Sequence, residues 1–172
     1  MPREPKKEIE EIVKKLGRYP IDAFAFVQEC LGIAANTVHG SMSDEEKAVA
    51  QWMAHNDLSI DDLRVSSEQG ELPMDIADAL KSMGGVETMN RHVTGEQLCW
   101  AIRDTALKQW GMMARSVLSR WNIASTKDIG AIIFALVDNG WLQKQPDDKQ
   151  EDFDNVFSFD EAFDQHYRIE TS

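Results

Sequence analysis

One stretch near the C-terminal end of the chain, residues 116–144, constrains the fold more than any other. It reads SVLSRWNIASTKDIGAIIFALVDNGWLQK. A first helical pattern stops at a turn over 122–125, and Thr126 can cap a second helix because its hydroxyl accepts a backbone N–H. Gly140 suits a left-handed end for that second helix. Its inner face is apolar at helical spacing, with Ile129, Ile132, Ile133, Leu136 and Val137. We therefore expect two helices joined by a tight turn.

The residues after the second helix predict a β-hairpin. Residues 141–145 (WLQKQ) alternate as a strand does, 146–155 (PDDKQEDFDN) form a polar loop, and 156–159 (VFSF) can return as a second strand. Asp160 could cap a last short helix. Helix, turn, helix and hairpin is the order of a winged helix-turn-helix. The predicted fold is therefore mainly α: a helical bundle with a winged-helix-like unit over 94–160 and a small antiparallel β-hairpin near the C-terminus.

Helical patterns also fill the N-terminal part of the chain. The first helix has an apolar stripe and stops at Gly17, and Tyr19-Pro20 opens a second one, because proline suits the first turn. Two capping boxes, SDEE at 43–46 and TGEQ at 94–97, predict further helix starts. We expect about seven helices in a single domain spanning 1–172.

Charge is distributed unevenly along this acidic chain. It has 18 Lys and Arg against 30 Asp and Glu, a formal net charge of −12. Residues 40–90 alone hold eleven acidic residues and three basic ones. Such a chain repels nucleic acid and anionic membranes at long range and stays soluble as a monomer or small oligomer. We interpret 40–90 as an acidic helical insert on a more compact frame.

The charge pattern argues against DNA binding by the winged-helix-like unit. The second helix of the pair offers Lys127 alone as a cation that could contact bases. Residues 144–172 contain nine acidic residues and three basic ones, although phosphate contacts each need a cation. A positive surface could still come from Arg103, Lys108, Arg115 and Arg120 with the first helix. We expect a protein partner rather than nucleic acid.

The sequence contains no motif of a known catalytic or metal site. Neither HExxH, CxxC, GxSxG nor a phosphate-binding glycine loop occurs, and the acidic run 147–154 lacks the central glycine of a calcium loop. Cys30 and Cys99 lie in apolar contexts and are predicted to be buried free thiols, although a disulfide is not excluded. We expect no catalytic residues, no metal and no cofactor. Without a signal-peptide core or a membrane-length apolar run, the predicted location is cytoplasmic.

The tryptophans suggest where a partner could bind. Trp52, Trp100 and Trp121 fit helix packing, whereas Trp110 and Trp141 lie at a predicted helix end and strand start. Exposed tryptophan beside methionine is typical of binding patches. We predict a partner-binding surface at Trp110, Met112, Trp141 and Lys127, with Met113 beside it.

Several segments resemble an uncharacterised protein family of Planctomycetes and Verrucomicrobia. They are YPIDAFAFVQECL, HVTGEQLCWAIRDTALKQWGMMARSVLSRWNI, TKDIGAIIFALVDNGWL and DFDNVFSFDEAF. The resemblance covers about the first 35 residues and everything from His92 on, and residues 40–90 are longer than its usual pattern. It implies no activity and no catalytic residues. His92, Asp128 and Asp152 in these segments are candidates for a polar site, although helix capping is the expected use.

The sequence therefore predicts a cytoplasmic, non-enzymatic protein-interaction or regulatory module on a winged-helix-like scaffold. A winged-helix DNA-binding transcriptional regulator is the first alternative. An enzyme without a recognisable motif is the second.

Overall fold

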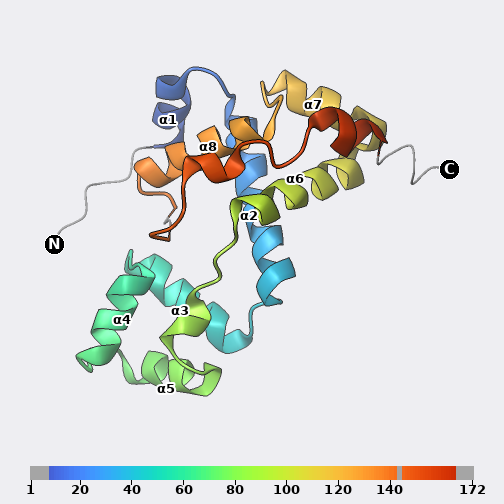
Figure 1. Ribbon diagram of the computed structural model, residues 1–172. Helices are drawn as coiled ribbons and strands as arrows, with labels where there is room; N and C mark the ends of the chain where they lie inside the picture. The colour runs from blue at the N-terminus through green and yellow to red at the C-terminus, as the bar shows by residue number, and fades with distance from the viewer. Residues whose placement is uncertain (1–7, 143–144, 166–172) are drawn as a thin grey trace. The chain divides into compact units, whose positions relative to one another are not determined.

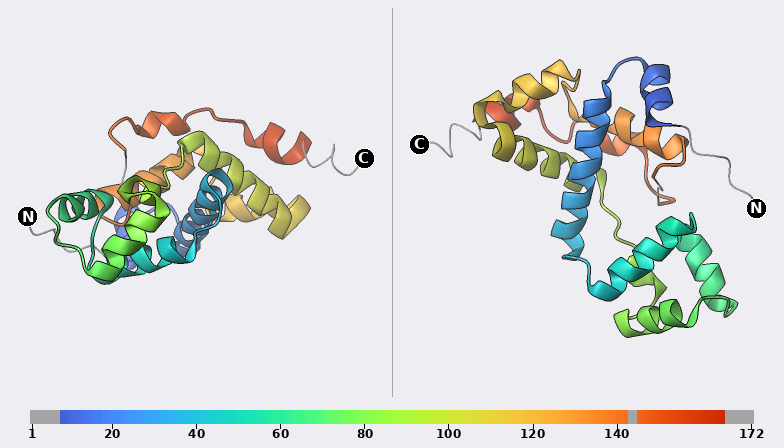
Figure 2. Two further views of the ribbon diagram at one scale, coloured as in Figure 1. Left: turned by 90° about the horizontal axis from the view of Figure 1, so that it is seen from below. Right: turned by 180° about the vertical axis from the view of Figure 1, so that it is seen from behind.

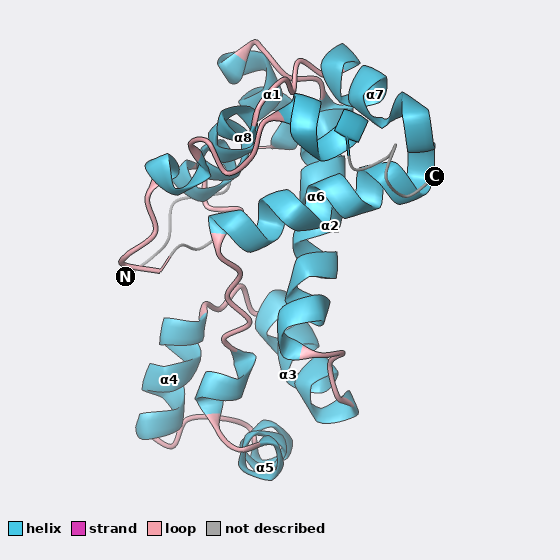
Figure 3. Cartoon of the chain, turned by 45° about the vertical axis from the view of Figure 1, so that its right-hand side comes forward, coloured by secondary structure: helices cyan, strands magenta, loops and turns pink. Residues whose placement is uncertain are grey.

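The computed structural model describes residues 8–142 and 145–165 of the chain, and these form helices and loops without a β-strand (Figures 1 and 3). Three short 3₁₀ segments and one π-helical turn supplement eight α-helices in the described part. The α-helices are α1 (Ile9–Leu16), α2 (Ile21–His39), α3 (Asp44–His55), α4 (Ile60–Glu68), α5 (Met74–Met83), α6 (Gly95–Trp110), α7 (Ala114–Arg120) and α8 (Thr126–Asp138). The remaining elements are η1 (Val86–Met89), η2 (Gly111–Met113), η3 (Gln150–Phe153) and the π-helical η4 (Asp160–Gln165).

The chain divides into two compact units. The terminal unit consists of Met1–Ala34 and Val93–Ser172, and the middle unit consists of Ala35–His92. The first boundary falls inside α2, and the second falls just before α6. Each unit has a separate hydrophobic core.

The core of the terminal unit forms between α2, α6 and α8. Phe24, Val27 and Cys30 of α2 are fully buried, and they belong to the same cluster as residues of α6 and α8. The α6 and α8 members include Leu98, Cys99, Ile102, Ile129, Ile132 and Leu136. Burial of each such aliphatic or aromatic side chain contributes about 1.5–3 kcal/mol. This cluster therefore holds together segments that are far apart in the sequence.

Capping residues and glycines in the sequence predicted many of the helix ends correctly. Gly17 ends α1 in a left-handed conformation (φ +68°), as predicted. Ser43 and Thr94 both cap their helices, accepting hydrogen bonds from the backbone of Glu46 and Gln97. After α8, Gly140 is left-handed (φ +81°), and the Trp141 N–H donates to the Leu136 carbonyl at 2.9 Å. That bond is typical of a Schellman motif.

The β-hairpin prediction is wrong, and with it the winged-helix-like unit. Residues 143–144 of the first predicted strand lie outside the described residues, and 156–158 of the second are irregular backbone. The Val156 N–H donates to the Thr126 hydroxyl (3.3 Å), which in turn donates to the Phe153 carbonyl (2.6 Å). The Val156 N–H, which a hairpin would pair, is thus bound by a side chain of α8. Thr126 is this anchor rather than a cap, and Ser125 occupies the N-cap position.

Aromatic side chains, rather than a hairpin, hold residues 150–163 against the helices. Residues 150–163, orange to red in Figures 1 and 2, run along α8 and α6. Phe153, Phe159 and Phe163 are buried, and Phe157 packs on Trp100 with 4.6 Å between ring centroids. The hydroxyl of Ser158, not Asp160, caps η4 by accepting the Glu161 N–H at 3.2 Å. The phenylalanines whose spacing was typical of a strand therefore anchor an irregular segment on helices.

Phe153 requires a glycine on α8. A Cβ atom at Gly130 would lie 2.8 Å from the Phe153 Cβ, closer than real contacts allow. At the start of α6, a Cβ at Gly95 would lie 3.3 Å from the Phe153 ring. The two glycines form the socket for this ring.

The middle unit is a small helical cluster formed by one continuous segment. Its buried residues come from α3, α4, α5 and η1: Val49, Met53, Leu63, Ile76, Leu80 and Met89. Arg91 joins the ends of the segment, because its guanidinium donates to Asn36 Oδ1 (2.7 Å) and to the Gly40 carbonyl (2.6 Å). In α4, Ser59 and Asp62 form a capping box that the sequence analysis did not identify.

Candidate functional site

The predicted polar residue Asp128 is part of a buried structural anchor. The residue is 6% exposed, and its carboxylate accepts the N–H groups of Ala124 (2.9 Å) and Ser125 (3.1 Å) before α8. The same carboxylate accepts the Tyr19 hydroxyl at 2.5 Å and lies 3.2 Å from the Arg18 guanidinium. Burial, followed by the hydrogen bond to Asp128, raises the pKa of Tyr19. Asp128 thus ties the link between α1 and α2 to the start of α8.

Asp152 and His92 have local structural contacts of a different kind. Asp152 is exposed and accepts the Lys149 N–H at 3.0 Å, which caps η3. His92 is half-buried in the middle unit, where His39 Nε2 donates to its backbone carbonyl at 2.6 Å. Asp128 and Asp152 therefore cap different helix starts, as the sequence analysis expected of such residues.

Trp110 and Trp141, predicted to contribute to a partner-binding surface, are half-buried against the core of the terminal unit. Trp110 packs on Phe26 (5.0 Å between ring centroids) and edge-on against Trp121 (5.5 Å). Trp141 follows the left-handed Gly140 and packs against the same core. Lys127 is exposed on the first turn of α8. The rings of both tryptophans thus contribute to packing.

Met112 and Met113 are exposed at the turn between α6 and α7. Met112 is 77% exposed and Met113 is 59% exposed. Met112 also lines an open depression of about 400 Å³ with Arg115, Ser116 and Ser119. Residues at this spacing lie on one face of a helix. We call Met112, Met113, Arg115, Ser116 and Ser119 the methionine surface. The spacing of 112, 115, 116 and 119 is the sequence signal that relates these residues.

The sequence around the methionine surface is basic, although the chain is acidic. Residues 98–127 contain five basic side chains and one acidic one, Asp104, which pairs with Arg103 at 2.6 Å. Lys108 and Arg120 are exposed on α6 and α7. Arg115 is half-buried and forms an ion pair with the exposed carboxylate of Asp160. An apolar patch with basic neighbours is suited to a partner that presents both apolar and acidic side chains.

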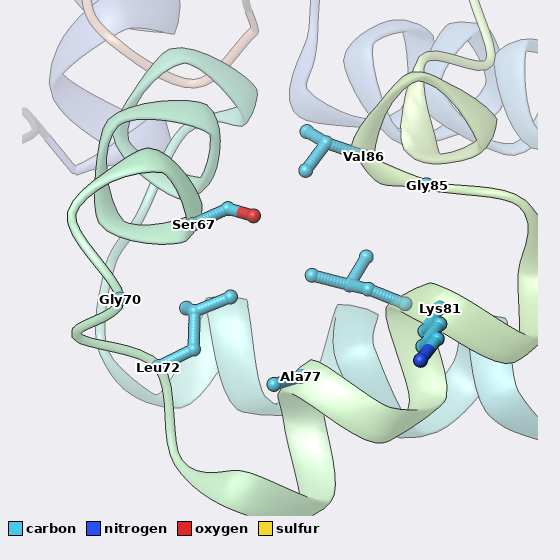
Figure 4. A pocket seen from close by; sticks show the side chains of 8 residues that line it. Ser67, Gly70, Leu72, Ala77, Lys81, Gly85 and Val86 are labelled. Atoms are coloured by element: carbon cyan, nitrogen blue, oxygen red, sulfur yellow. The ribbon is translucent and has the colours of Figure 1, made fainter.

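A second depression lies entirely within the middle unit. It measures about 240 Å³ and lies between the end of α4, α5 and η1 (Figure 4). Leu72, Leu80 and Val86 supply its apolar wall, and Ser67, Ala77 and Lys81 line it as well, with Gly70 and Gly85. We call it the middle-unit pocket. The sequence carried no motif for it, because its wall consists of ordinary aliphatic residues from three elements.

The cysteines are buried thiols, and the described residues contain no cluster of potential metal ligands. Burial raises the pKa of Cys30 to about 12, and it does the same for Cys99, so both are protonated thiols at neutral pH. Over 8–142 and 145–165, no three His, Cys, Asp or Glu side chains are grouped as a metal ion requires. In the same residues, no helix has both the length and the apolar character needed to span a bilayer.

No protein-family model, curated protein or solved structure matches this chain. The resemblance to the family of Planctomycetes and Verrucomicrobia therefore stays a prediction.

Proposed function

We propose that this chain is a protein-interaction module that binds a partner through the methionine surface. The observation that carries the proposal is the pair of exposed methionines, Met112 and Met113, among basic side chains. Exposed large apolar side chains that lie together mark interaction sites more often than exposed single ones. Methionine suits this use because its flexible, polarisable side chain adapts to differently shaped partners.

The chemistry of the depression supports a partner with acidic side chains. Arg115 supplies a guanidinium, and Ser116 and Ser119 supply hydroxyl donors beside it. Arginine binds carboxylates with more than one N–H, which gives both affinity and orientation. Asp160 of this chain forms an ion pair with Arg115 through Nη1. The proposed partner segment therefore carries apolar residues for Met112 and Met113 and carboxylates for Arg115.

We further propose that the interaction takes place in the cytoplasm. Cys30 and Cys99 are free, buried thiols, which suits a reducing compartment.

Affinity purification from the native cell with matched variants tests the proposal. Met112→Glu and Arg115→Glu place negative charge on the methionine surface, and we expect each to lower partner recovery at least about tenfold. Val38→Glu is the matched control, because Val38 is also exposed (40%) but lies in the middle unit and lines neither depression. Equal losses for Met112→Glu and Val38→Glu would contradict the proposal.

A DNA titration tests the competing class of partner. The purified chain is mixed with random duplex DNA in a gel-shift series over increasing salt. We expect no complex at micromolar protein, because the net charge of −12 opposes approach to the phosphates. Micromolar, strongly salt-dependent binding that is lost in Arg115→Glu would instead assign the basic residues around α7 to nucleic acid.

A further inference from the structure

We propose that the middle-unit pocket is a second docking site, which receives one bulky apolar side chain from a protein segment whose flanking residues are basic. The site goes beyond the proposed function, because it lies in the other unit and selects the opposite charge. It does not depend on the methionine surface, and either site can fail its test without the other.

The size of the pocket indicates a side chain rather than a small-molecule ligand. Its volume of about 240 Å³ is below the roughly 300–1,000 Å³ typical of sites that enclose drug-sized molecules. One large aliphatic or aromatic side chain fits this space, and such anchors supply most of the affinity in many protein interfaces. Figure 4 shows Leu72 and Val86 reaching toward the same space from opposite walls.

Hydrogen bonds hold the walls of the pocket in place before any ligand binds. The Gly85 N–H donates to the Leu80 carbonyl (2.8 Å), and the Glu71 N–H donates to the Ser66 carbonyl (2.9 Å). Arg64 of α4 also forms an ion pair with Glu87 of η1 at 2.7 Å, which links two of the walls. A preformed pocket lowers the entropy cost of binding.

The charges at the pocket specify the flanks of the bound segment. Glu68, Glu71 and Asp78 are exposed, and each is next in sequence to a residue that lines the pocket. Residues 40–90 as a whole carry eleven acidic side chains and three basic ones. Lys81, one of these three, lines the pocket itself and disfavours a cation inside it. The apolar wall of Leu72, Leu80 and Val86 disfavours a charge of either sign, so the anchor is uncharged, and the basic residues lie on either side of it.

Three helical peptides of equal length probe this recognition on the full chain. The first presents a leucine with lysines on either side of it, the second has glutamate in place of each lysine, and the third has alanine in place of the leucine. We expect the lysine–leucine peptide to shift the amide signals of Gly70 and Gly85 in ¹⁵N spectra, and to bind at least about tenfold more tightly than either of the others. Equal binding of the lysine–leucine and lysine–alanine peptides would overturn the apolar anchor. Preference for the glutamate peptide would overturn the charge assignment.

Two variants locate the binding on the protein. Ala77→Phe fills the pocket from an exposed helical position, whereas Ala48→Phe makes the same change on the exposed face of α3. We expect Ala77→Phe to lower the affinity for the lysine–leucine peptide at least about tenfold and Ala48→Phe to leave this affinity unchanged. The surface variant Glu68→Gln/Glu71→Gln/Asp78→Asn should weaken binding and reduce its salt dependence. Equal effects of Ala77→Phe and Ala48→Phe, or unchanged binding in the triple variant, would overturn the site.

Discussion

The terminal and middle units are stabilised by different kinds of buried side chain. The terminal core contains the aromatic residues Tyr19, Phe24, Phe26, Phe153, Phe159 and Phe163, whereas the middle core contains only aliphatic and methionine side chains among its described buried members. The terminal unit also buries Thr105, Thr126 and Asp128. Aromatic rings and buried polar groups need matching partners, whereas aliphatic and methionine side chains adapt to their neighbours. Stability in the terminal unit therefore depends on a few specific fits.

The separation of the contacting segments explains this difference. Tyr19 and Asp128 are 109 positions apart, and Thr126 binds a carbonyl 27 positions later. The middle unit, by contrast, is one continuous segment. A unit that joins distant segments loses more chain entropy on folding, and specific contacts offset that loss. The surfaces of the two units also differ, in their charge. The methionine surface has basic neighbours in the sequence, whereas the middle-unit pocket has acidic ones.

The largest effect is expected from the Phe153 socket. Phe153→Ala removes a ring that is 5% exposed and should lower the free energy of unfolding of the terminal unit by about 3–5 kcal/mol. Urea unfolding followed by tryptophan fluorescence measures the change, since only Trp52 of the five tryptophans lies in the middle unit.

Gly130→Ala provides the matching test of the close approach. In the wild-type chain it should cost about 1–3 kcal/mol, because the new Cβ would lie 2.8 Å from Phe153. In the Phe153→Ala background the same change should be neutral or stabilising, because the clash is gone and alanine favours helix. Equal costs in both backgrounds would show that Gly130 is not required by the ring.

These two residues also show why the sequence predicted the helices better than the C-terminal segment. Gly17, Ser43 and Gly140 act on backbone groups within a few residues, so their roles follow from local sequence. The socket for Phe153 comes from Gly95 and Gly130, which no local pattern relates to it. The same limit applies to the sites: Met112 stood out by type, whereas Leu72, Leu80 and Val86 become a pocket only through the fold.

Alkaline pH is expected to destabilise the terminal unit and to spare the middle one. Burial raises the pKa of Cys30 and of Cys99 from 9.0 to about 12, and both belong to the terminal core. A raised folded pKa means that the unfolded thiol loses its proton first, so stability is complete below about pH 9 and falls as pH rises toward 12. At pH 10 the loss is about 1 kcal/mol for each thiol.

Urea midpoints at pH 7.5 and pH 10, measured under reducing conditions, test this difference. The middle unit contains neither cysteine nor tyrosine, so its transition serves as the internal reference. The Cys30→Ala/Cys99→Ala chain should be less stable at both pH values but should lose most of the pH dependence. A fall in stability of the same size in both units would contradict the assignment to the thiols.

The smallest expected effect is a difference in stability between variants of two carboxylates that have the same position in their helices. Asp128 and Asp62 each lie three residues after an N-cap serine and accept that serine's N–H, at 3.1 Å and 2.9 Å. Only Asp128 also accepts the buried Tyr19 hydroxyl and the Ala124 N–H. Asp128→Asn should therefore cost about 2 kcal/mol, since an amide leaves some of these donors unsatisfied, whereas Asp62→Asn should cost about 0.5–1 kcal/mol. Urea unfolding of both variants measures the difference, and equal costs would mean that Asp128 acts as an ordinary cap, with no added stability from joining the α1–α2 link to α8.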